Sequence, residues 1–300
     1  MPEQYASNVG PSLIDIAYES FGEINAPPLL LIMGLGGQML GWHEDFCSEL
    51  ATRGLRPIRF DNRDCGHSTH FAGAPEPNLS AALTGDVSTA TYGLADMAAD
   101  AVGLLDALLI DRAHIVGISM GGQIAQIIAT EFPARVRSLT SMMSWTGARD
   151  VGQPAPEVMN LFRRPPAQTR EQAMDNAVAA FRVIGSPGYP LDEAMVRDRA
   201  ALAFDRDHDL TGLKRQAMAA IVSGDRTARL ATVRAPTLVI HGLDDRMVDP
   251  SGGRATAAAI PGAELVMIEG LGHNLPRELW PRLAGLIAKH AHGADNTQPR

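Results

Sequence analysis

The stretch that most constrains the fold of this chain is the pentapeptide GISMG at residues 117–121. The segment that leads into Ser119 (112–118) contains the short β-branched run of a strand buried on both faces, and the residues after the pentapeptide carry isoleucines at helical spacing. Ser119 is therefore expected at a sharp corner between strand and helix, where flanking glycines let the two elements pass closely. This placement exposes the serine hydroxyl at the carboxyl edge of a sheet, beside helix amides that can stabilise an oxyanion.

Strand-like and helix-like segments alternate along most of the chain. Such alternation predicts an α/β fold with a mostly parallel, doubly wound sheet whose sites lie at the carboxyl ends of the strands. Strands are expected at 12–21, 27–34, 55–60, 112–118, 136–144, 235–242 and 263–270. Helices are expected at 42–53, 92–109, 120–133, 251–260 and 276–290. A surface loop with one short helical turn is expected at 71–90.

The pattern changes between residues 145 and 229. Prolines separate helical pieces there, and no segment has the pattern of a central strand. We therefore predict a core of residues 1–144 and 230–300 with a helical cap of residues 145–229. An insertion at this point must lie over the carboxyl edge of the sheet, and so over Ser119.

A serine hydroxyl needs a base to become nucleophilic, and the base needs a carboxylate to orient it. In the chain order serine, acid, histidine, both groups are expected on loops after late strands. The loop after strand 235–242 offers Asp244 or Asp245, and the loop after strand 263–270 offers His273. His241 also stands at a strand end, but we interpret it as a histidine packed beneath the site.

The glycine-dense loop GLGGQMLGW follows the strand at 27–34. Glycines let backbone amides approach a ligand closely, so this loop is expected to supply one oxyanion donor. The candidate donors are the backbone N–H groups of Leu35 and Met120. Asp61, Arg63 and Asp64 follow the next strand and are interpreted as a network that stabilises their own turn.

Composition excludes several kinds of partner. The formal net charge of -8 and the scarcity of lysine argue against a nucleic-acid or anionic-membrane partner. Cys47 and Cys65 lack the spacing of a metal site or a disulfide framework, so buried thiols, no metal and no cofactor are expected. The absence of a leader-like N-terminus and of an 18-residue apolar run leads us to expect a cytoplasmic protein.

These segments together resemble the α/β-hydrolase superfamily over nearly the full length of the chain. The resemblance rests on MGLGG at the oxyanion loop, DNRDCGHS, GISMG as the nucleophile elbow, GLDD and GLGHNLP. The chain is most similar to the capped esterases related to aclacinomycin methylesterase. The resemblance implies the α/β-hydrolase fold with a helical cap, and it places the acid at Asp245 and the base at His273.

The chain departs from the superfamily pattern in two places. Met33 replaces the customary histidine before the oxyanion loop, so that loop is expected to be held by packing. Asp64 and Cys65 replace small residues in the turn after the next strand, which leaves the hydrogen bonding of that turn open.

The expected activity is hydrolysis of small to medium uncharged carboxylic esters through an acyl-enzyme on a Ser-Asp-His triad. The expected pocket is apolar, so a small uncharged ester is the expected partner. The residues expected to line this pocket are Gly34, Met142, Met143, Trp145, Met159, Phe162, Phe181 and Met218. Two alternatives stay open: a cofactor-free perhydrolase or haloperoxidase on the same triad, and a hydrolase-fold ligand-binding protein. Dehalogenase and epoxide-hydrolase chemistry needs a carboxylate nucleophile at position 119, so the serine there argues against both activities.

Overall fold

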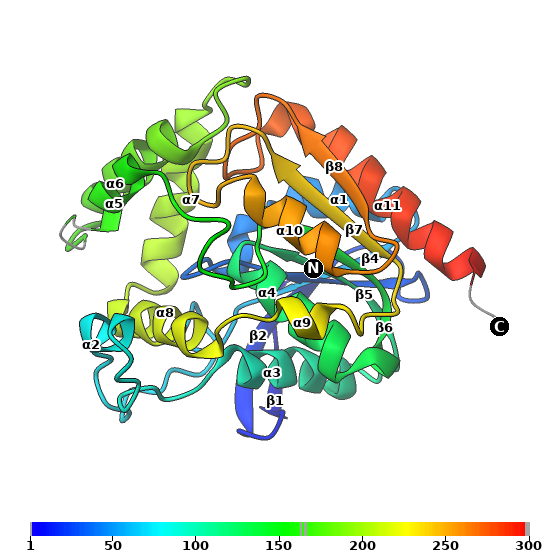
Figure 1. Ribbon diagram of the computed structural model, residues 1–300, viewed down its shortest axis with the longest axis horizontal. Coiled ribbons are helices and arrows are strands. Elements are labelled where there is room, and N and C mark those ends of the chain that lie inside the picture. Colours follow the sequence, from blue (N-terminus) through cyan, green and yellow to red (C-terminus); the bar gives the residue numbers. More distant parts are fainter. Residues whose placement is uncertain (1, 163, 165–166, 298–300) are drawn as a thin grey trace.

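The buried strands pair into one eight-stranded sheet in the order β1-β2-β4-β3-β5-β6-β7-β8 (Figure 1). The computed structural model describes residues 2–162, 164 and 167–297, without the side chains of Phe162 and Thr297. β1 and β2 pair antiparallel with each other, and β2 pairs antiparallel with β4; the remaining pairs are parallel. The strands are β1 (Gln4–Val9), β2 (Ile14–Ser20), β3 (Pro28–Ile32), β4 (Arg56–Phe60), β5 (Ala113–Ile118), β6 (Val136–Met142), β7 (Thr237–Gly242) and β8 (Glu264–Ile268).

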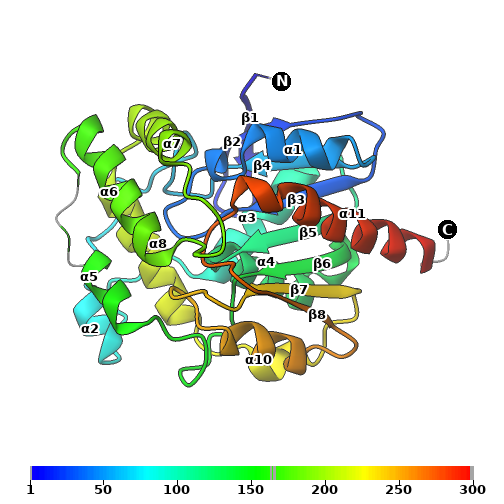
Figure 2. The same ribbon diagram turned by 90° about the horizontal axis from the view of Figure 1, so that it is seen from above.

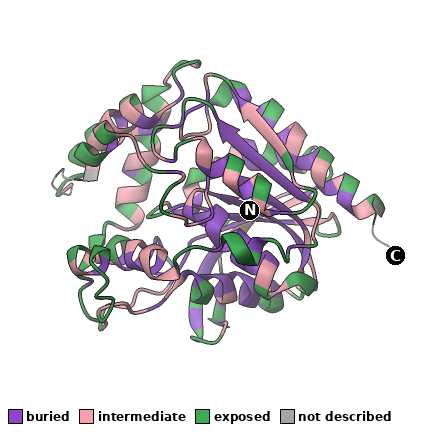
Figure 3. Cartoon of the chain, in the orientation of Figure 1, coloured by how far each residue is buried: buried purple, intermediate pink, exposed green. Residues whose placement is uncertain are grey.

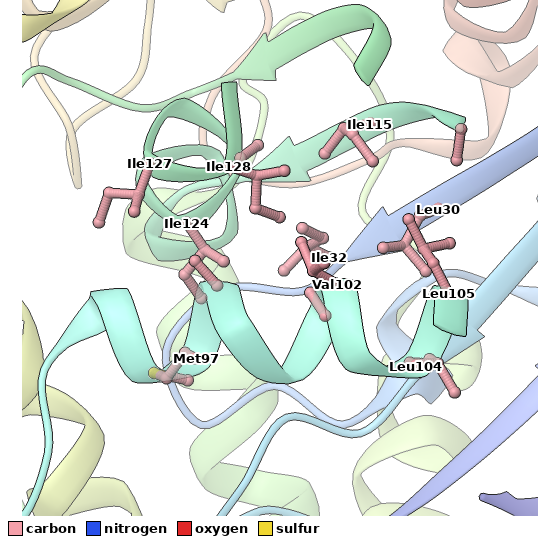
Figure 4. Packing of buried hydrophobic residues seen from close by; sticks show 14 of the residues in the cluster. Leu30, Ile32, Met97, Val102, Leu104, Leu105, Ile115, Ile124, Ile127 and Ile128 are labelled. Carbon is pink, nitrogen blue, oxygen red and sulfur yellow. The ribbon is translucent and has the colours of Figure 1, made fainter. Parts of the chain in front are cut away.

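Helices cover both faces of this sheet, because its central strands are apolar on both sides. On one face, α3 (Leu94–Ala107) and α4 (Met120–Glu131) bury leucine and isoleucine side chains against β3 and β5 (Figure 4). On the other face, α1 (Glu44–Ala51) and α11 (Trp280–Thr297) form a second apolar cluster with β3 and β7. α10 (Ser251–Ala259) packs beside β7 and β8. The predicted doubly wound α/β fold is confirmed.

The chain between β6 and β7 forms helices, with no strand among its described residues. Three of these helices begin at a side chain that accepts a hydrogen bond from the first turn: Thr169 for α6, Asp192 for α7 and Asp209 for α8. The helices are α5 (Met159–Phe162), α6 (Arg170–Ile184), α7 (Glu193–Arg206), α8 (Leu210–Ser223) and α9 (Thr227–Leu230). In Figure 3 α5–α7 carry mainly exposed and half-buried residues and α8 also has buried ones, whereas the strands are mainly buried.

Helices α5–α8 gather at one end of the strands (Figure 2). The loops after three parallel strands contact this region: Gly36 after β3 and Asp64 after β4 lie against α8, and His273 after β8 donates its N–H to the Ile184 carbonyl (2.7 Å). Those loops leave the carboxyl ends of their strands. The helices between β6 and β7 therefore lie over the carboxyl edge of the sheet.

Some elements differ from the expected ones. β1 was not expected, because its polar and small residues lack a strong apolar alternation; it is an edge strand whose register shifts between Ala6 and Val9. α11 continues to Thr297, beyond the expected end at residue 290. The loop after β4 contains α2 (Leu79–Leu83), in agreement with the expected short helical turn. Within the described ranges, every helix is too short or too polar to cross a membrane.

Candidate active site

Ser119 occupies a strained corner between β5 and α4. Its φ of 56° and ψ of -122° lie in a region that residues with a side chain rarely adopt. The corner is possible only with glycine on both sides: a Cβ at Gly117 would lie 2.0 Å from the Gly121 carbonyl oxygen, and one at Gly121 would lie 2.2 Å from the Ile32 oxygen. The Ser119 N–H donates to the Met142 carbonyl (2.9 Å), which anchors the corner to β6.

Asp245 and His273 meet at the carboxyl edge of the sheet. His273 Nδ1 lies 2.7 Å from Asp245 Oδ2, and the other carboxylate oxygen accepts the N–H groups of Met247 and Val248 (both 2.9 Å). Burial by itself would raise the pKa of Asp245, but the charge and hydrogen bond of His273, together with His241, hold that pKa at about 2. The carboxylate is therefore ionised at neutral pH, so it accepts a hydrogen bond from His273 Nδ1–H, and Nε2 is the ring nitrogen left for proton transfer.

Asp244, the alternative candidate for the acid, and His241, the other histidine at a strand end, make different contacts. Asp244 is exposed, and its Oδ2 accepts the Gly270 N–H (2.9 Å), which ties together the loops after β7 and β8. His241 is fully buried; its Nε2 lies 2.9 Å from the Val248 carbonyl oxygen and 3.4 Å from Asp245 Oδ2. It packs against the Asp245 carboxylate, as expected for a histidine beneath the site.

The loop after β3 passes directly beside Ser119. A Cβ at Gly34 would lie 3.0 Å from the Ser119 Cβ and 3.5 Å from its Oγ. The Gly37 N–H donates to the Gly34 carbonyl (3.0 Å), which closes a tight turn around Leu35. Because the C=O and N–H of a trans peptide point in opposite directions, the Leu35 N–H points out of this turn. No described residue accepts a hydrogen bond from it.

Met120, the second candidate donor, is the first residue of α4, so its N–H has no helical acceptor. The side chain of Met33 packs against Gly37 and Gly41, as expected for a loop held by packing. Side-chain hydrogen bonds also hold the loop, however: Asn62 Nδ2 donates to the Met33 carbonyl (3.1 Å), and Gln216 accepts the Gly36 N–H (2.8 Å).

The acidic residues after β4 do more than stabilise their own turn. Asp61 accepts the Met39 and His67 N–H groups, and Asp64 accepts the Phe71 N–H, as expected for loop carboxylates. Their cationic partners lie in the helices between β6 and β7: Arg206 pairs with Asp61 (2.8 Å), and Arg215 forms two hydrogen bonds with Asp64 (2.7 and 2.8 Å).

Arg63, which follows the same strand, pairs instead with Asp100 of α3. A purely local network was therefore the wrong interpretation. No sequence motif marks Arg206 or Arg215. Each lies more than 140 residues from its aspartate along the chain, so local spacing could not have predicted either pair.

The expected pocket residues lie in different environments. Met142, Met143 and Met218 are fully buried, Gly34 is buried beside Ser119, and Trp145 is half-buried. Met159 is exposed. The side chain of Phe162 lies outside the described residues. Phe181 is half-buried and lines a surface depression of about 740 Å³.

This depression lies between the end of α6 and the loop after β7. It reaches Asp245 and Asn274, the residue that follows His273, but Ser119 and His273 are not part of its lining. Its carboxylates (Glu157, Asp244, Asp245 and Asp249) outnumber its guanidinium groups, those of Arg182 and Arg246. Each of these arginines is already paired with a glutamate.

Comparisons with known proteins agree with this geometry. A model of the alpha/beta hydrolase fold family matches residues 27–276. Rhodomycin D methylesterase DauP of Streptomyces sp. (strain C5) is 32% identical, over 92% of this chain and 94% of its own. Rhodomycin D methylesterase DnrP of Streptomyces peucetius is 31% identical with the same coverage. The structure of the enol-lactonase from Burkholderia xenovorans LB400 matches with a TM-score of 0.74 and 25% identity, over 96% of this chain and 100% of its own.

The chain therefore belongs to the α/β hydrolase fold family. Within that family, the protein is a carboxylic ester hydrolase.

Proposed function

We propose that the protein hydrolyses uncharged carboxylic esters through an acyl-enzyme formed on Ser119. His273 is the general base, Asp245 orients it, and the N–H groups of Leu35 and Met120 bind the oxyanion. The observation that carries the proposal is the 2.7 Å contact between His273 Nδ1 and Asp245 Oδ2. A carboxylate bonded to Nδ1 orients the ring and leaves Nε2 as the nitrogen that can act as base towards a serine hydroxyl.

The reaction has two halves. In the first, Nε2 of His273 takes the Ser119 proton while Oγ attacks the ester carbonyl carbon. The tetrahedral oxyanion accepts hydrogen bonds from the two amides, and it collapses as the imidazolium gives its proton to the departing alkoxide. In the second, His273 takes a proton from water, the resulting hydroxide attacks the acyl carbonyl, and the same proton returns to Ser119. The products are an alcohol and a carboxylic acid.

The backbone around Ser119 supports this assignment. A strained φ at a non-glycine residue persists only where the surrounding structure enforces it, and such residues concentrate at functional sites. The strain here turns the serine towards the Gly34 loop, whose next amide has no acceptor among the described residues. An oxyanion would supply that acceptor.

We further propose that residues 145–229 act as a cap, and that the substrate is a methyl or other small-alcohol ester of a larger uncharged molecule. Two relatives are named as methylesterases, which supports a small alcohol product. Apolar residues of the insertion such as Phe181, together with Trp145 at its start, supply apolar surface for the acyl part.

Trapping the acyl-enzyme tests the proposal. Rapid quenching during turnover of a p-nitrophenyl ester should give protein heavier by one acyl group, and peptide mapping should place that group on Ser119. Ser119→Ala should lower kcat by about 10⁶-fold, as loss of a triad serine does elsewhere. An acyl group mapped to another residue, or a Ser119→Ala variant with wild-type turnover, would rule the mechanism out.

A further inference from the structure

We propose that Gln216, on helix α8 of the insertion, is a positioning residue for the oxyanion loop. The inference rests on the proposed function, because it concerns the Leu35 N–H that we assign to the oxyanion. It adds a role for the insertion: through Gln216, the helices over the site help to assemble the catalytic groups.

Gln216 is fully buried and uses both ends of its amide. Its Oε1 accepts the Gly36 N–H (2.8 Å), and its Nε2 donates to the Arg63 carbonyl (2.7 Å). The side chain thus bridges the loop after β3 and the loop after β4, from a helix 180 residues farther along the chain than Gly36. A buried amide with both ends satisfied has one preferred orientation, so it holds both loops in fixed positions.

The helix and the loop also approach each other closely at Gly36. This residue has a φ of +64°, and a Cβ there would lie 2.5 Å from the Leu213 Cδ1 atom of α8. A side chain there would have to displace the end of the Leu213 side chain, and the positive φ favours glycine. The Gly36 N–H can therefore meet Gln216 directly.

The Gly36 contact controls the direction of the Leu35 N–H. Leu35 and Gly36 are the two central residues of the turn that the Gly37 N–H closes onto the Gly34 carbonyl. One side of the turn is held by that bond and the other by Gln216, while Asn62 holds the preceding Met33 carbonyl. If the Gln216 bond is lost, the turn keeps only its own Gly37–Gly34 bond, so the Leu35–Gly36 peptide can tilt and shift the neighbouring Gly34–Leu35 peptide, which carries the donor.

An oxyanion donor contributes to the rate only when it is placed before the reaction begins. Loss of a donor costs about 10²- to 10³-fold in kcat, and a displacement of about 1 Å can cost about 10²-fold. For Gln216→Met, which keeps the side-chain volume and removes both hydrogen bonds, we expect kcat to fall by about 10- to 100-fold. KM should stay within about threefold, since the contact acts on the transition state.

The experiment compares four variants of the full-length protein on one p-nitrophenyl ester, and in the three that keep Ser119 the active sites are counted by the burst so that kcat refers to folded enzyme. Gln126→Met is the matched control: Gln126 is also fully buried, and it donates to Ser141 within the core. Gln216→Glu keeps an acceptor for the Gly36 N–H, and burial favours its protonated form, which can still donate to the Arg63 carbonyl, so it should retain more activity than Gln216→Met. The fourth variant is Ser119→Ala. A trifluoromethyl ketone, which forms an oxyanion adduct with a reactive serine, probes the hole independently of turnover.

The proposal is supported if Gln216→Met lowers kcat and weakens the trifluoromethyl ketone by the same factor, while Gln126→Met changes neither. It is overturned if Gln216→Met keeps wild-type kcat in an enzyme that Ser119→Ala inactivates. It is also overturned if Gln126→Met loses as much activity as Gln216→Met, or if Gln216→Glu does no better than Gln216→Met. Full activity in Ser119→Ala would instead overturn the proposed function, and this inference with it.

Discussion

His273 Nδ1 lies 2.7 Å from Asp245 Oδ2, and this bond joins two loops that are 28 residues apart in the chain. The loops follow β7 and β8, neighbouring parallel strands at the edge of the sheet. Because parallel strands end at the same edge, their following loops are adjacent whatever lies between them. The bond between acid and base is thus a direct consequence of sheet order.

The first prediction separates the two neighbouring aspartates. Asp245→Asn should lower kcat by about 10⁴-fold, because an amide favours the wrong tautomer of the histidine. Asp244→Asn is the matched control: its side chain is exposed and keeps an oxygen that can accept the Gly270 N–H, so its kcat should stay within about threefold of wild type. Steady-state kinetics of both variants on one ester decide the matter, and a larger loss in Asp244→Asn would reverse the assignment.

The second prediction concerns stability in acid. The pKa of Asp245 in the fold is about 2, below its ordinary value of 3.8, so the ionised carboxylate stabilises the native state. The contribution is about 2 kcal/mol at neutral pH, from 1.36 kcal/mol per pKa unit. It should be complete above about pH 4 and be lost as the pH falls through about 2.

Urea unfolding of the wild type and of Asp245→Asn measures the contribution of the Asp245 carboxylate to the free energy of unfolding. Asparagine does not titrate, so the difference in unfolding free energy between the two proteins should shrink as the pH is lowered from about 4 to about 2. A difference that is constant over this range would mean that the carboxylate gains nothing from its histidine partners.

The third prediction tests the connection between α8 and the loop after β4. Arg215→Met leaves the buried Asp64 carboxylate without its cation, and breaking a buried pair in this way costs about 3–5 kcal/mol. Arg170→Met is the control, since Arg170 and Asp205 form an exposed pair worth about 0–1 kcal/mol. Urea unfolding compares the two losses.

Limited proteolysis locates the effect of Arg215→Met. New cleavage should concentrate in residues 145–229, because the variant loosens the insertion from the core. If Arg170→Met and Arg215→Met lowered the free energy of unfolding equally, Arg215 would contribute no more than a surface charge.

The fourth prediction concerns the charge of the substrate. Carboxylates outnumber guanidinium groups around the depression beside Asp245, and both of its arginines already have glutamate partners. Bringing an anionic ester to such a surface is unfavourable. A neutral ester should therefore have the higher kcat/KM of two esters with the same leaving group, and the ratio should shrink as salt is added. A preference for the anionic ester would show that arginines of the insertion face the substrate.

Local patterns in the sequence determined much of this protein. The corner at Ser119 requires glycine at 117 and 121, because a Cβ at either position would overlap backbone atoms, and the sequence supplies both. The alternation of apolar strands and amphipathic helices predicted the parallel sheet, and sheet order then placed the loops of Asp245 and His273 side by side. β1 was not predicted, since this edge strand is stabilised by pairing with β2 rather than by an apolar pattern of its own.

Only the tertiary structure decided how the helices between β6 and β7 attach to the core. Asp64 was expected to serve its own turn, yet its cation is Arg215, and Gln216 beside it holds the Gly36 N–H. Glutamine and arginine are common on helix surfaces, so nothing in their local sequence distinguishes a partner on a distant loop from solvent. Such pairs are determined by which surfaces the folded chain brings together, and that depends on all the packing between them.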